Sequence, residues 1–334
     1  MPSSWRLGSG DSVDQLEHNP LSVGGRVELD FPLPTYKVIV SSADLSMPAV
    51  VRHDNPLAFH AAAAPVIARN EVEGVALEVS IAGFVRNPPK PGVLHYLATV
   101  NENGCEGAAC IYGGEVVALG ASDPDAARSF AHDLATLKPI ITGVLGMASP
   151  CGAFLDAWTE LHGGSHRIGK HFRQHLLHDI LPVAIPAGVP RVAEVGDLAG
   201  LLEAQGEIDA EGGWPSHSDR EERTLRAIEK MRYWVWDNDG PVSYAAFTPA
   251  LRPVARIAPV ATPREKRGKG YATALTAALV HSLREAKYES IVLATHIDAP
   301  IPNAIYARIG FRPTTESFRF VIVPPDTPPG LVRR

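Results

Sequence analysis

Arg256–Leu275 reads RIAPVATPREKRGKGYATAL, and this stretch decides the fold. It starts as an apolar run with strand character that ends at Thr262-Pro263, and a basic loop containing glycine follows. Tyr271 then begins a run of good helix formers. The first N–H groups of a helix have no partner inside the helix, and they carry the positive end of its dipole. The stretch therefore predicts a strand, a tight loop and a helix N-terminus that can bind phosphate.

The letters of the loop exclude two nucleotide-binding motifs. A Walker loop requires Gly-Lys followed by Ser or Thr, whereas here Lys269 precedes Gly270. A dinucleotide-binding fingerprint requires a third small residue where Thr273 stands. The pattern that does fit is Arg-x-x-Gly-x-Ala, formed by Arg267, Gly270 and Ala272. At this point the sequence resembles the GNAT superfamily of N-acetyltransferases, in which this motif binds the pyrophosphate of acetyl-coenzyme A.

A second segment carries the same resemblance. Asn303–Phe311 reads NAIYARIGF and is similar to the family's segment of Asn, a hydrophobic residue or Tyr, and a final Gly-Phe. Two independent motifs at the expected separation are more specific than either alone. The resemblance is specific over Val254–Phe311 and topological over the first half, and the layout is similar to two-copy GNAT acetyltransferases whose first copy is degenerate.

Length and composition set the class of the chain. Its 334 residues can form two domains with hydrophobic cores, and 45% apolar and 20% charged residues are typical of a soluble globular protein. A formal net charge of -6 argues against a nucleic-acid partner. No apolar run reaches the roughly 18 residues of a membrane span, and no signal peptide is evident. Cys105, Cys110 and Cys151 predict no disulfide framework and a reducing, cytoplasmic location.

Turn and periodicity signals divide the chain into an arm and two halves. Residues 1–34 predict an irregular arm. The first half predicts, in order, a helix from Asn55 to Ala82, strands at Leu94–Val100, Gly107–Tyr112 and Val116–Gly120 joined by hairpin turns at 101–104 and Gly113-Gly114, a helix from Asp123-Pro124 to Leu137, a strand at Ile140–Leu145 and a helix from Ser149.

The second half repeats this order. Its predicted elements are a strand at Arg191–Ala193, a helix capped by Asp197, a helix at Glu222–Lys230, strands at Met231–Trp236, Val242–Phe247 and Val254–Thr262, a helix from Tyr271, a strand at Ile291–Thr295, a helix at Asn303–Ile309 and a strand at Phe318–Val323. The strands at 254–262 and 291–295 flank one crossover helix, so they are expected to be parallel.

We therefore predict an α/β fold with a mixed sheet (α+β), in which two GNAT-like acyl-CoA acyltransferase folds follow in tandem around a central parallel strand pair. Residues 35–180 are expected to be the degenerate copy and residues 181–334 the catalytic copy. The strand-to-helix loop of the first copy, Gly120–Asp125, has Asp123 and Asp125 where the second has Arg267 and Lys269. These carboxylates satisfy a helix N-terminus but repel pyrophosphate, so the first copy is expected to be a scaffold.

The resemblance implies roles for the residues of the second copy. In the family, residues before the loop bind the pantetheine arm, the loop and first helical turn bind the pyrophosphate, and the later segment contacts the cofactor. Here these positions are Val260, Ala261, Thr262, Arg267, Gly268, Lys269, Gly270, Tyr271, Ala272, Thr273, Asn303 and Tyr306. Pro259 favours a β-bulge that frees N–H groups for the thioester, although a proline at a twisted edge is an alternative.

The chemistry requires a proton for the departing thiolate and a base for the amine. Tyr306 stands at the family's general-acid position, with a packing role as the alternative. Many relatives carry a glutamate as base in the strand before the loop, but Arg256–Thr262 has none. His296 is therefore the candidate base, and Asp298 is a candidate to relay the proton through water. The alternative for His296 is a histidine that is exposed to solvent or contacts the substrate.

Three further groups have competing interpretations. His171 and His175 have the spacing that binds a metal on a helix, but cationic neighbours favour an exposed basic connector between the copies and no metal. Among the aromatic residues Trp214, Tyr233, Trp234 and Trp236, one strand face is expected in the core, and the other is a candidate lining for the acceptor pocket. Glu207 and Glu211 either attract a cationic amine or are solvated helix charges.

The sequence thus predicts an acetyl-CoA-dependent N-acetyltransferase that transfers an acetyl group to a primary amine of a small molecule or amino-acid-like substrate. No Cys-His pair lies near the loop, so direct attack in a ternary complex is favoured over a covalent intermediate. The alternatives are a non-catalytic acyl-CoA-binding or sensing protein and an acyltransferase for longer chains. No membrane partner is expected, and a homodimer is left open as the assembly.

Overall fold

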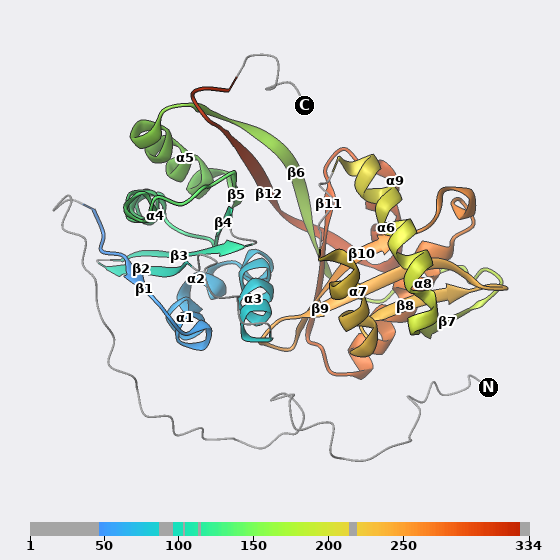
Figure 1. Ribbon diagram of the computed structural model, residues 1–334. Helices are drawn as coiled ribbons and strands as arrows, with labels where there is room; N and C mark the ends of the chain where they lie inside the picture. Colours follow the sequence, from blue (N-terminus) through green and yellow to red (C-terminus); the bar gives the residue numbers. More distant parts are fainter. Residues whose placement is uncertain (1–46, 87–95, 103, 113–114, 214–218, 328–334) are drawn as a thin grey trace. The chain divides into compact units, whose positions relative to one another are not determined.

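The computed structural model describes residues 47–86, 96–102, 104–112, 115–213 and 219–327 (Figure 1). The predicted arm at 1–34, the Gly113-Gly114 turn and Trp214 lie outside these residues. These described residues belong to one compact unit.

Twelve strands are present in the described part of the chain. Their bounds are Val51–Arg52 (β1), Leu97–Glu102 (β2), Cys105–Tyr112 (β3), Val116–Leu119 (β4), Gly143–Gly146 (β5), Ser165–Leu177 (β6), Val189–Val192 (β7), Tyr233–Asp237 (β8), Pro241–Pro249 (β9), Val254–Ala261 (β10), Ser290–His296 (β11) and Phe311–Val323 (β12).

The helices of the same described ranges lie between these strands. Their bounds are Pro56–Ala62 (α1), Ala64–Arg69 (α2), Glu71–Arg86 (α3), Pro124–Leu137 (α4), Ala148–His162 (α5), Leu198–Gly212 (α6), Arg220–Glu229 (α7), Tyr271–Glu285 (α8) and Pro300–Ile309 (α9), with 3-10 turns at Val195–Asp197 and Arg264–Lys266.

All these strands belong to one mixed sheet in the order β1-β2-β3-β4-β5-β12-β6-β11-β10-β9-β8-β7. The pairs β4–β5 and β10–β11 are parallel, and the other neighbours are antiparallel. Each parallel pair follows an antiparallel meander and flanks one crossover helix, α4 in the first half and α8 in the second. The predicted mixed α/β fold, with the order repeated in both halves, is confirmed.

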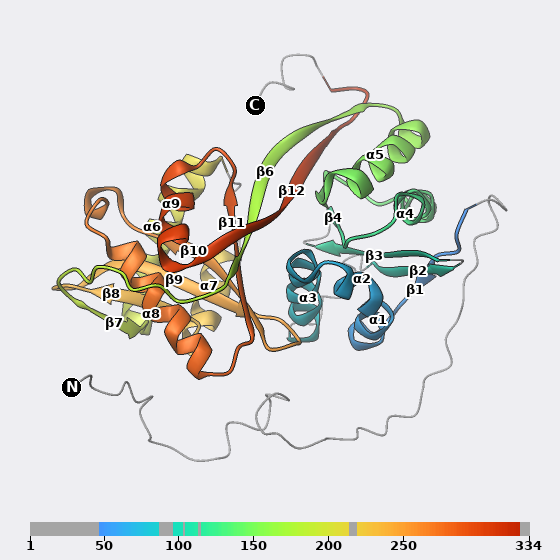
Figure 2. The same ribbon diagram turned by 180° about the vertical axis from the view of Figure 1, so that it is seen from behind.

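The two halves exchange their last strands. β6 follows α5 in the chain, yet it lies between β11 and β12, and β12 in turn pairs with β5 (Figures 1 and 2). The pairing of β6 with β12 extends from Ser165↔Val323 to Leu177↔Phe311. The sheet is therefore continuous across the predicted boundary between the two halves at residue 180. The last strand of each half completes the sheet of the other half.

The prediction of an exposed basic connector between the copies is wrong, because Ser165–Leu177 is the central strand β6. Along a strand, residues four positions apart lie about 13 Å from each other, so His171 and His175 do not meet at one ion. His175 is buried and its ring hydrogen-bonds Thr295, whereas the His171 ring hydrogen-bonds Glu316. The basic composition of the segment concealed the strand, because consecutive apolar residues occur only at its C-terminal end.

One predicted helix is divided into three. Asn55 caps α1 as predicted, accepting hydrogen bonds from the N–H groups of Leu57 and Ala58. Pro65 then stands in the first turn of α2, and extended backbone at Asn70 separates α2 from α3. Asp197 is the N-cap residue of α6 as predicted, but its carboxylate accepts from the Glu194 N–H and from Arg191 and not from α6.

Helices cover both faces of the sheet in the second half. α8 and α9 bury Ile257 and Leu293 on one face. α6 and α7 bury Val235 on the other. α3, which belongs to the first half, extends this second layer because its Val72 and Val75 pack with Val254 and Val292. A helix of the first half therefore takes part in the core of the second.

Candidate functional site

The parallel strands β10 and β11 diverge within the sheet. Val254–Arg256 pair with Ser290–Val292, and the pairing stops there although both strands continue. The register between β10 and β9 shifts between Ile257 and Val260, so the bulge predicted from Pro259 is confirmed. A bulge leaves backbone groups unpaired. A gap in the sheet thus opens from the bulge toward the C-terminal ends of β10 and β11.

The equivalent pair in the first half stays closed. Val116–Ala118 pair with Gly143–Leu145 almost to the ends of both short strands. A Cβ atom at Gly146 would lie 2.8 Å from the Leu119 carbonyl oxygen, so the backbones are in contact there. The first copy has no space between its parallel strands for a pantetheine arm.

The glycine loop connects the open pair to helix α8. Gly268 and Gly270 have φ values of +79° and +84°, in the left-handed region that favours glycine. No atom lies within 4 Å of an ideal Cβ at either position, so the surface of the loop is open. Gly270 is the N-cap of α8, and no side chain caps this helix. The first N–H groups of α8 are therefore available to an anion.

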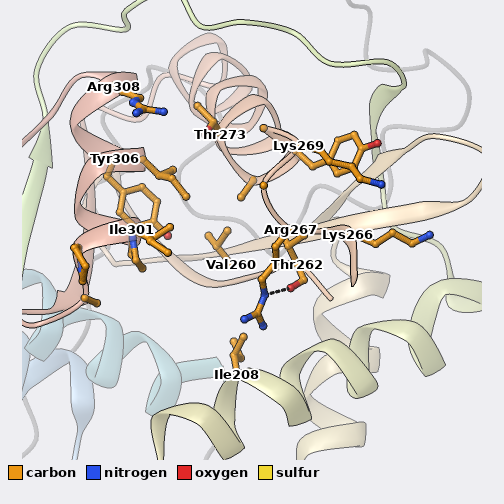
Figure 3. A pocket seen from close by; sticks show the side chains of 18 of the residues that line it. Ile208, Val260, Thr262, Lys266, Arg267, Lys269, Thr273, Ile301, Tyr306 and Arg308 are labelled. Carbon is orange, nitrogen blue, oxygen red and sulfur yellow. Dashed lines mark hydrogen bonds between the residues drawn. The ribbon is translucent and has the colours of Figure 1, made fainter. Parts of the chain in front are cut away.

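A cavity of about 610 Å³ joins the gap, the loop and helix α9 (Figure 3). Ten of the residues predicted to bind the cofactor line it: Val260, Thr262, Arg267, Gly268, Lys269, Gly270, Tyr271, Ala272, Thr273 and Tyr306. Ile301 and Ile305 of α9 and Ile208 of α6 add apolar surface. One end is cationic and contains the free helix N-terminus, and the other is apolar. This combination fits a pyrophosphate joined to a pantetheine arm.

Two predicted residues do not line the cavity. The Ala261 side chain is buried in the core beneath α6, and its carbonyl accepts a hydrogen bond from the Ser243 hydroxyl. The Asn303 amide donates to the carbonyls of His296, Ile297 and Ala299, and its oxygen accepts from Thr295. Asn303 therefore holds the turn between β11 and α9, which positions Tyr306 one helical turn later.

Tyr306 is a buried phenol at the apolar end of the cavity (Figure 3). Its ring packs edge-on against Phe311, at 5.9 Å between centroids. Among the described residues, its hydroxyl has no hydrogen-bond partner. Burial raises the pKa of Tyr306, so the phenol stays protonated at neutral pH. It can therefore donate a proton or a hydrogen bond to a group in the cavity.

The predicted base has a different environment. His296 is at the end of β11, is 41% exposed, and places its Nδ1 4.0 Å from an Asp298 carboxylate oxygen. Its ring meets Phe172 of β6 edge-on. By strand alternation the His296 side chain lies on the face of Val292, which α3 covers, rather than on the face of α8.

Glu73 on α3 is a titratable group that sequence reasoning missed. It is 4% exposed, and its Oε1 has no hydrogen-bond partner. Burial raises the pKa of Glu73 to about 7, against the opposing effect of the Arg256 charge. Arg256 is the last residue of β10 that pairs with β11. The only signal in the sequence is a carboxyl inside a helix rich in Ala and Val.

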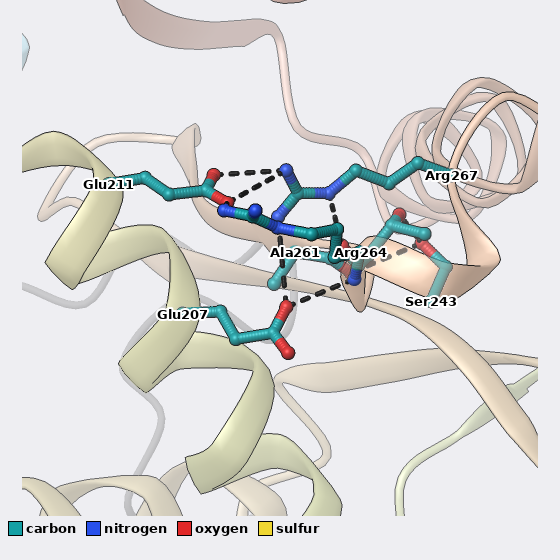
Figure 4. Close-up of polar contacts among 7 residues, drawn as sticks. Glu207, Glu211, Ser243, Ala261, Arg264 and Arg267 are labelled. Atoms are coloured by element: carbon teal, nitrogen blue, oxygen red, sulfur yellow. Dashed lines mark hydrogen bonds and ion pairs between the residues drawn. The ribbon is translucent and has the colours of Figure 1, made fainter.

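Arg267 is held by carboxylates of α6 (Figure 4). Its guanidinium donates to Glu211 at 3.0 and 3.1 Å and to the Thr262 carbonyl, and lies 3.8 Å from Glu207. Arg264 donates to both glutamates, through its side chain to Glu211 and its backbone N–H to Glu207. These bonds lower the pKa of Glu211. Glu207 and Glu211 therefore pair with arginines in and before the glycine loop, and neither carboxylate stands alone in solvent.

The aromatic residues of β8 occupy cores on both faces. Trp236 is fully buried beneath α8 with Trp234 beside it, and Tyr233 is buried with Val235 beneath α6 and α7. The Tyr233 hydroxyl accepts from Gln205, and it reaches the edge of a second cavity. Core packing is therefore the main role of both sets.

The corresponding loop of the first copy is closed by side chains. Arg69 binds Asp123 and Glu106, and the Asp123 carboxylate also accepts from the Glu106 N–H at 2.7 Å. Asp123 is the N-cap residue of α4 as predicted, but its side chain makes no hydrogen bond to the helix. Its carboxylate instead holds the loop against β3. The negative charges of Asp123 and Glu106, which already have partners, oppose the binding of an anion at this loop.

Comparison with protein families matches residues 202–311 to the acetyltransferase (GNAT) family. Residues 202–311 form a GNAT acetyltransferase domain. The matched range includes the β10 bulge, the glycine loop and Tyr306, which are the parts of the cavity described above. No curated protein matches the chain.

Solved structures share the fold over both halves. A GCN5-related N-acetyltransferase from Sphaerobacter thermophilus has a TM-score of 0.55 at 16% identity and covers 83% of this chain and 97% of its own. A tandem GNAT protein from the clavulanic acid biosynthesis pathway has a TM-score of 0.52 at 17% identity, covering 84% and 99%. A GNAT-family acetyltransferase from Colwellia psychrerythraea has a TM-score of 0.50 at 11% identity, covering 82% and 99%. One of these structures, the protein from the clavulanic acid pathway, is described as a tandem GNAT protein.

The described ranges 47–86, 96–102, 104–112, 115–213 and 219–327 were searched for metal-binding groups and for membrane-spanning helices, and they contain neither. No group of three or more His, Cys, Asp or Glu side chains there is placed to hold a metal ion. No helix in these ranges has the length and apolar character needed to cross a bilayer.

Proposed function

We propose that the chain is an acetyl-CoA-dependent N-acetyltransferase that acts on a primary amine of a small molecule or amino-acid-like substrate. The observation that carries the proposal is the open strand pair, which leads from a free helix N-terminus to an unpartnered phenol within one cavity. The GNAT domain supports acyl transfer in general, and the cavity supports acetyl-CoA as the donor. The proposed location is the cytoplasm.

The loop residues 267–273 bind the pyrophosphate through N–H groups and the charges of Arg267 and Lys269. Unpaired backbone N–H groups at the Val260 bulge stabilise the oxygen of the thioester as negative charge develops on it. The amine nitrogen attacks the carbonyl carbon, the carbon–sulfur bond breaks, and Tyr306 donates its proton to the departing thiolate. A base removes the proton that the nitrogen loses. The acetyl group therefore passes directly from the thioester to the amine, without a covalent enzyme intermediate.

His296, assisted by Asp298, is the proposed base, acting through water. Glu73 is the alternative that the structure adds, because a carboxyl with a pKa of about 7 lies beside Arg256, where the strands diverge. The pH profile of kcat/KM distinguishes the two. If Glu73 is the base, the rise of kcat/KM near pH 7 is lost in Glu73→Gln and is kept in His296→Gln. If the rise is lost only in His296→Gln, His296 is the base.

We further propose that residues 35–180 are a scaffold and residues 181–334 carry the catalytic site. The closed β4–β5 pair and the filled Gly120–Asp125 loop support the first role. The scaffold still contributes β6 and α3 to the second half, so it is needed for the catalytic fold.

Turnover of acetyl-CoA with a panel of amines tests the function. Release of free thiol together with an amine product heavier by one acetyl group is the expected result. Binding of acetyl-CoA without thiol release for any amine would favour a non-catalytic sensor. Faster turnover of longer acyl-CoA donors would favour an acyltransferase for larger chains, for which Ile208, Ile301 and Ile305 provide apolar surface.

A further inference from the structure

A second cavity, of about 690 Å³, reaches the bulge of β10 from a different side. Its walls are helices α3, α6 and α7, and its floor is formed by β8, β9 and β10. Ala258 and Pro259 line this second cavity, whereas their neighbour Val260 lines the first. Consecutive residues of the β10 bulge therefore line the two cavities, so the second cavity borders the segment where the thioester is proposed to lie.

The wall of this cavity carries an excess of positive charge. Arg86, Arg220, Arg223, Arg226, Lys230 and Arg232 line it, against the carboxylates of Asp209 and Asp219 only. Those two carboxylates already have partners, because Asp209 pairs with Arg220 and Asp219 with Arg223. The remaining cations include Arg86, Lys230 and Arg232, none of which forms an ion pair with a carboxylate of the described residues.

Arg86, Lys230 and Arg232 form a cluster that we call the cation cluster. Burial and the charge of Arg232 lower the pKa of Arg86 to about 10. The pKa of Lys230 is lowered by burial and then by the charges of Arg232 and Arg86. All three residues line the second cavity. Arg86 is fixed by donating to the carbonyls of Pro249 and Ala250, while the Arg232 side chain has no hydrogen bond in the described structure.

Arg86 and Arg232 are partly buried and Lys230 is exposed, and partly buried cations of like charge destabilise a fold unless an anion compensates them. A guanidinium group binds a carboxylate through two parallel N–H···O bonds, which add geometric specificity to the charge. The cluster comes from both halves of the chain, with Arg86 on α3 and Lys230 and Arg232 beside α7 and β8. It therefore has the composition of an anion site formed where the scaffold helix meets the catalytic sheet.

We propose that the second cavity is the acceptor site and that it selects a primary amine carrying a carboxylate, which the cation cluster binds while the amine reaches Ala258-Pro259. This inference rests on the proposed acetyltransferase function and names its substrate class. Simple alkylamines and diamines lack the anion, and diamines add a repelled charge. The acceptor is thus expected to be of the amino-carboxylate type.

The test compares amines of equal chain length with the full chain and acetyl-CoA. The probes are 6-aminohexanoate, hexylamine, 1,6-diaminohexane and 6-aminohexylphosphonate. We expect kcat/KM for 6-aminohexanoate to exceed that for hexylamine and the diamine by at least about tenfold, as for one charge-assisted contact. Equal rates for hexylamine and 6-aminohexanoate overturn the inference but leave the acetyltransferase function intact. A faster phosphonate overturns the choice of carboxylate, and no acetylation of any amine overturns the proposed function itself.

Arg232→Gln separates binding from folding. Removing one of the repelling cations should leave the melting temperature unchanged or raise it, while kcat/KM for 6-aminohexanoate falls about tenfold and that for hexylamine does not change. Arg232→Glu should reverse the preference toward the diamine. Arg128→Gln is the matched control, because Arg128 is an exposed arginine paired with Asp125 in the first half. A parallel loss of activity toward hexylamine and 6-aminohexanoate in Arg232→Gln would show a merely structural role and overturn the inference.

Discussion

Tyr306 is the residue on which the proposed proton transfer to sulfur depends. Its hydroxyl is available in the cavity, and burial keeps it protonated. Tyr306→Phe removes only the oxygen and preserves the packing against Phe311. We expect kcat to fall about 100-fold, as is typical for loss of a general acid, with the dissociation constant of coenzyme A unchanged. Steady-state kinetics and calorimetry measure the two quantities, and an undiminished kcat would remove Tyr306 from the mechanism.

Glu73 makes the stability of the fold depend on pH. Its pKa is about 7 in the folded protein and near its ordinary value of 4.5 when unfolded, so between these values the folded state binds more protons. The stabilising contribution is complete below pH 4.5 and is lost as the pH rises through 7, by up to roughly 3 kcal/mol. Glu73→Gln should remove this dependence. Urea unfolding at about pH 5 and about pH 8 measures it, and equal pH dependence of wild type and variant would contradict the assignment.

Most of the predicted cofactor residues line the first cavity, but their partners could not be predicted from the sequence. Arg267, Gly268 and Gly270 were predictable because positive φ, a basic loop and a helix N-terminus follow from local residue types. Glu73 and Arg86 were not, because both lie on a helix of the first half and reach the catalytic half only through tertiary packing. Their chemistry depends on neighbours distant in sequence.

At the level of secondary-structure elements, the carboxylates of α6 neutralise arginines in and before the glycine loop. Glu211 on α6 binds Arg264 and Arg267, which a pyrophosphate also requires. Glu211→Gln releases these cations and removes a charge that repels phosphate. We expect coenzyme A to bind about three- to tenfold more tightly, a modest gain because exposed ion pairs of this kind are screened by solvent and contribute little.

The matched control for Glu211→Gln is Glu222→Gln on α7, where the glutamate forms an exposed pair with Arg226. Calorimetric titration with coenzyme A at low and physiological salt gives both dissociation constants. Weaker binding by Glu211→Gln would show that Glu211 orients Arg267 for the pyrophosphate instead of competing for it. Unchanged affinity in Glu222→Gln is expected, since that pair lies outside the cofactor cavity.

The predictions for individual elements succeeded where a local signal was present. The bulge at Pro259 and the helix cap at Asn55 follow from the chemistry of one residue. Strand β6 was missed because it is central in the sheet yet basic and only half-buried over most of its length. Its position depends on pairing with β12, which is far away in the chain, and local composition carries no information about such a partner.

At the scale of the whole molecule, the repeated order of elements predicted two copies of one fold, but not the exchange of β6 and β12 between them. Exchange makes each half incomplete alone. The first copy, which lacks an open strand pair, supplies β6 to the sheet of the second half and α3 to its core. The two loops nevertheless have separate roles, so they can be altered independently.

Arg267→Glu and Asp123→Asn test this division of roles within one continuous sheet. Arg267→Glu places a negative charge at the free N-terminus of α8 and should abolish coenzyme A binding without a large change in melting temperature. Asp123→Asn weakens the contacts to Arg69 and to the Glu106 N–H and should lower the free energy of unfolding by about 1 to 3 kcal/mol. Calorimetry should still give one coenzyme A per chain for Asp123→Asn. Two bound molecules in wild type, or residual binding in Arg267→Glu, would place a second site in the first copy.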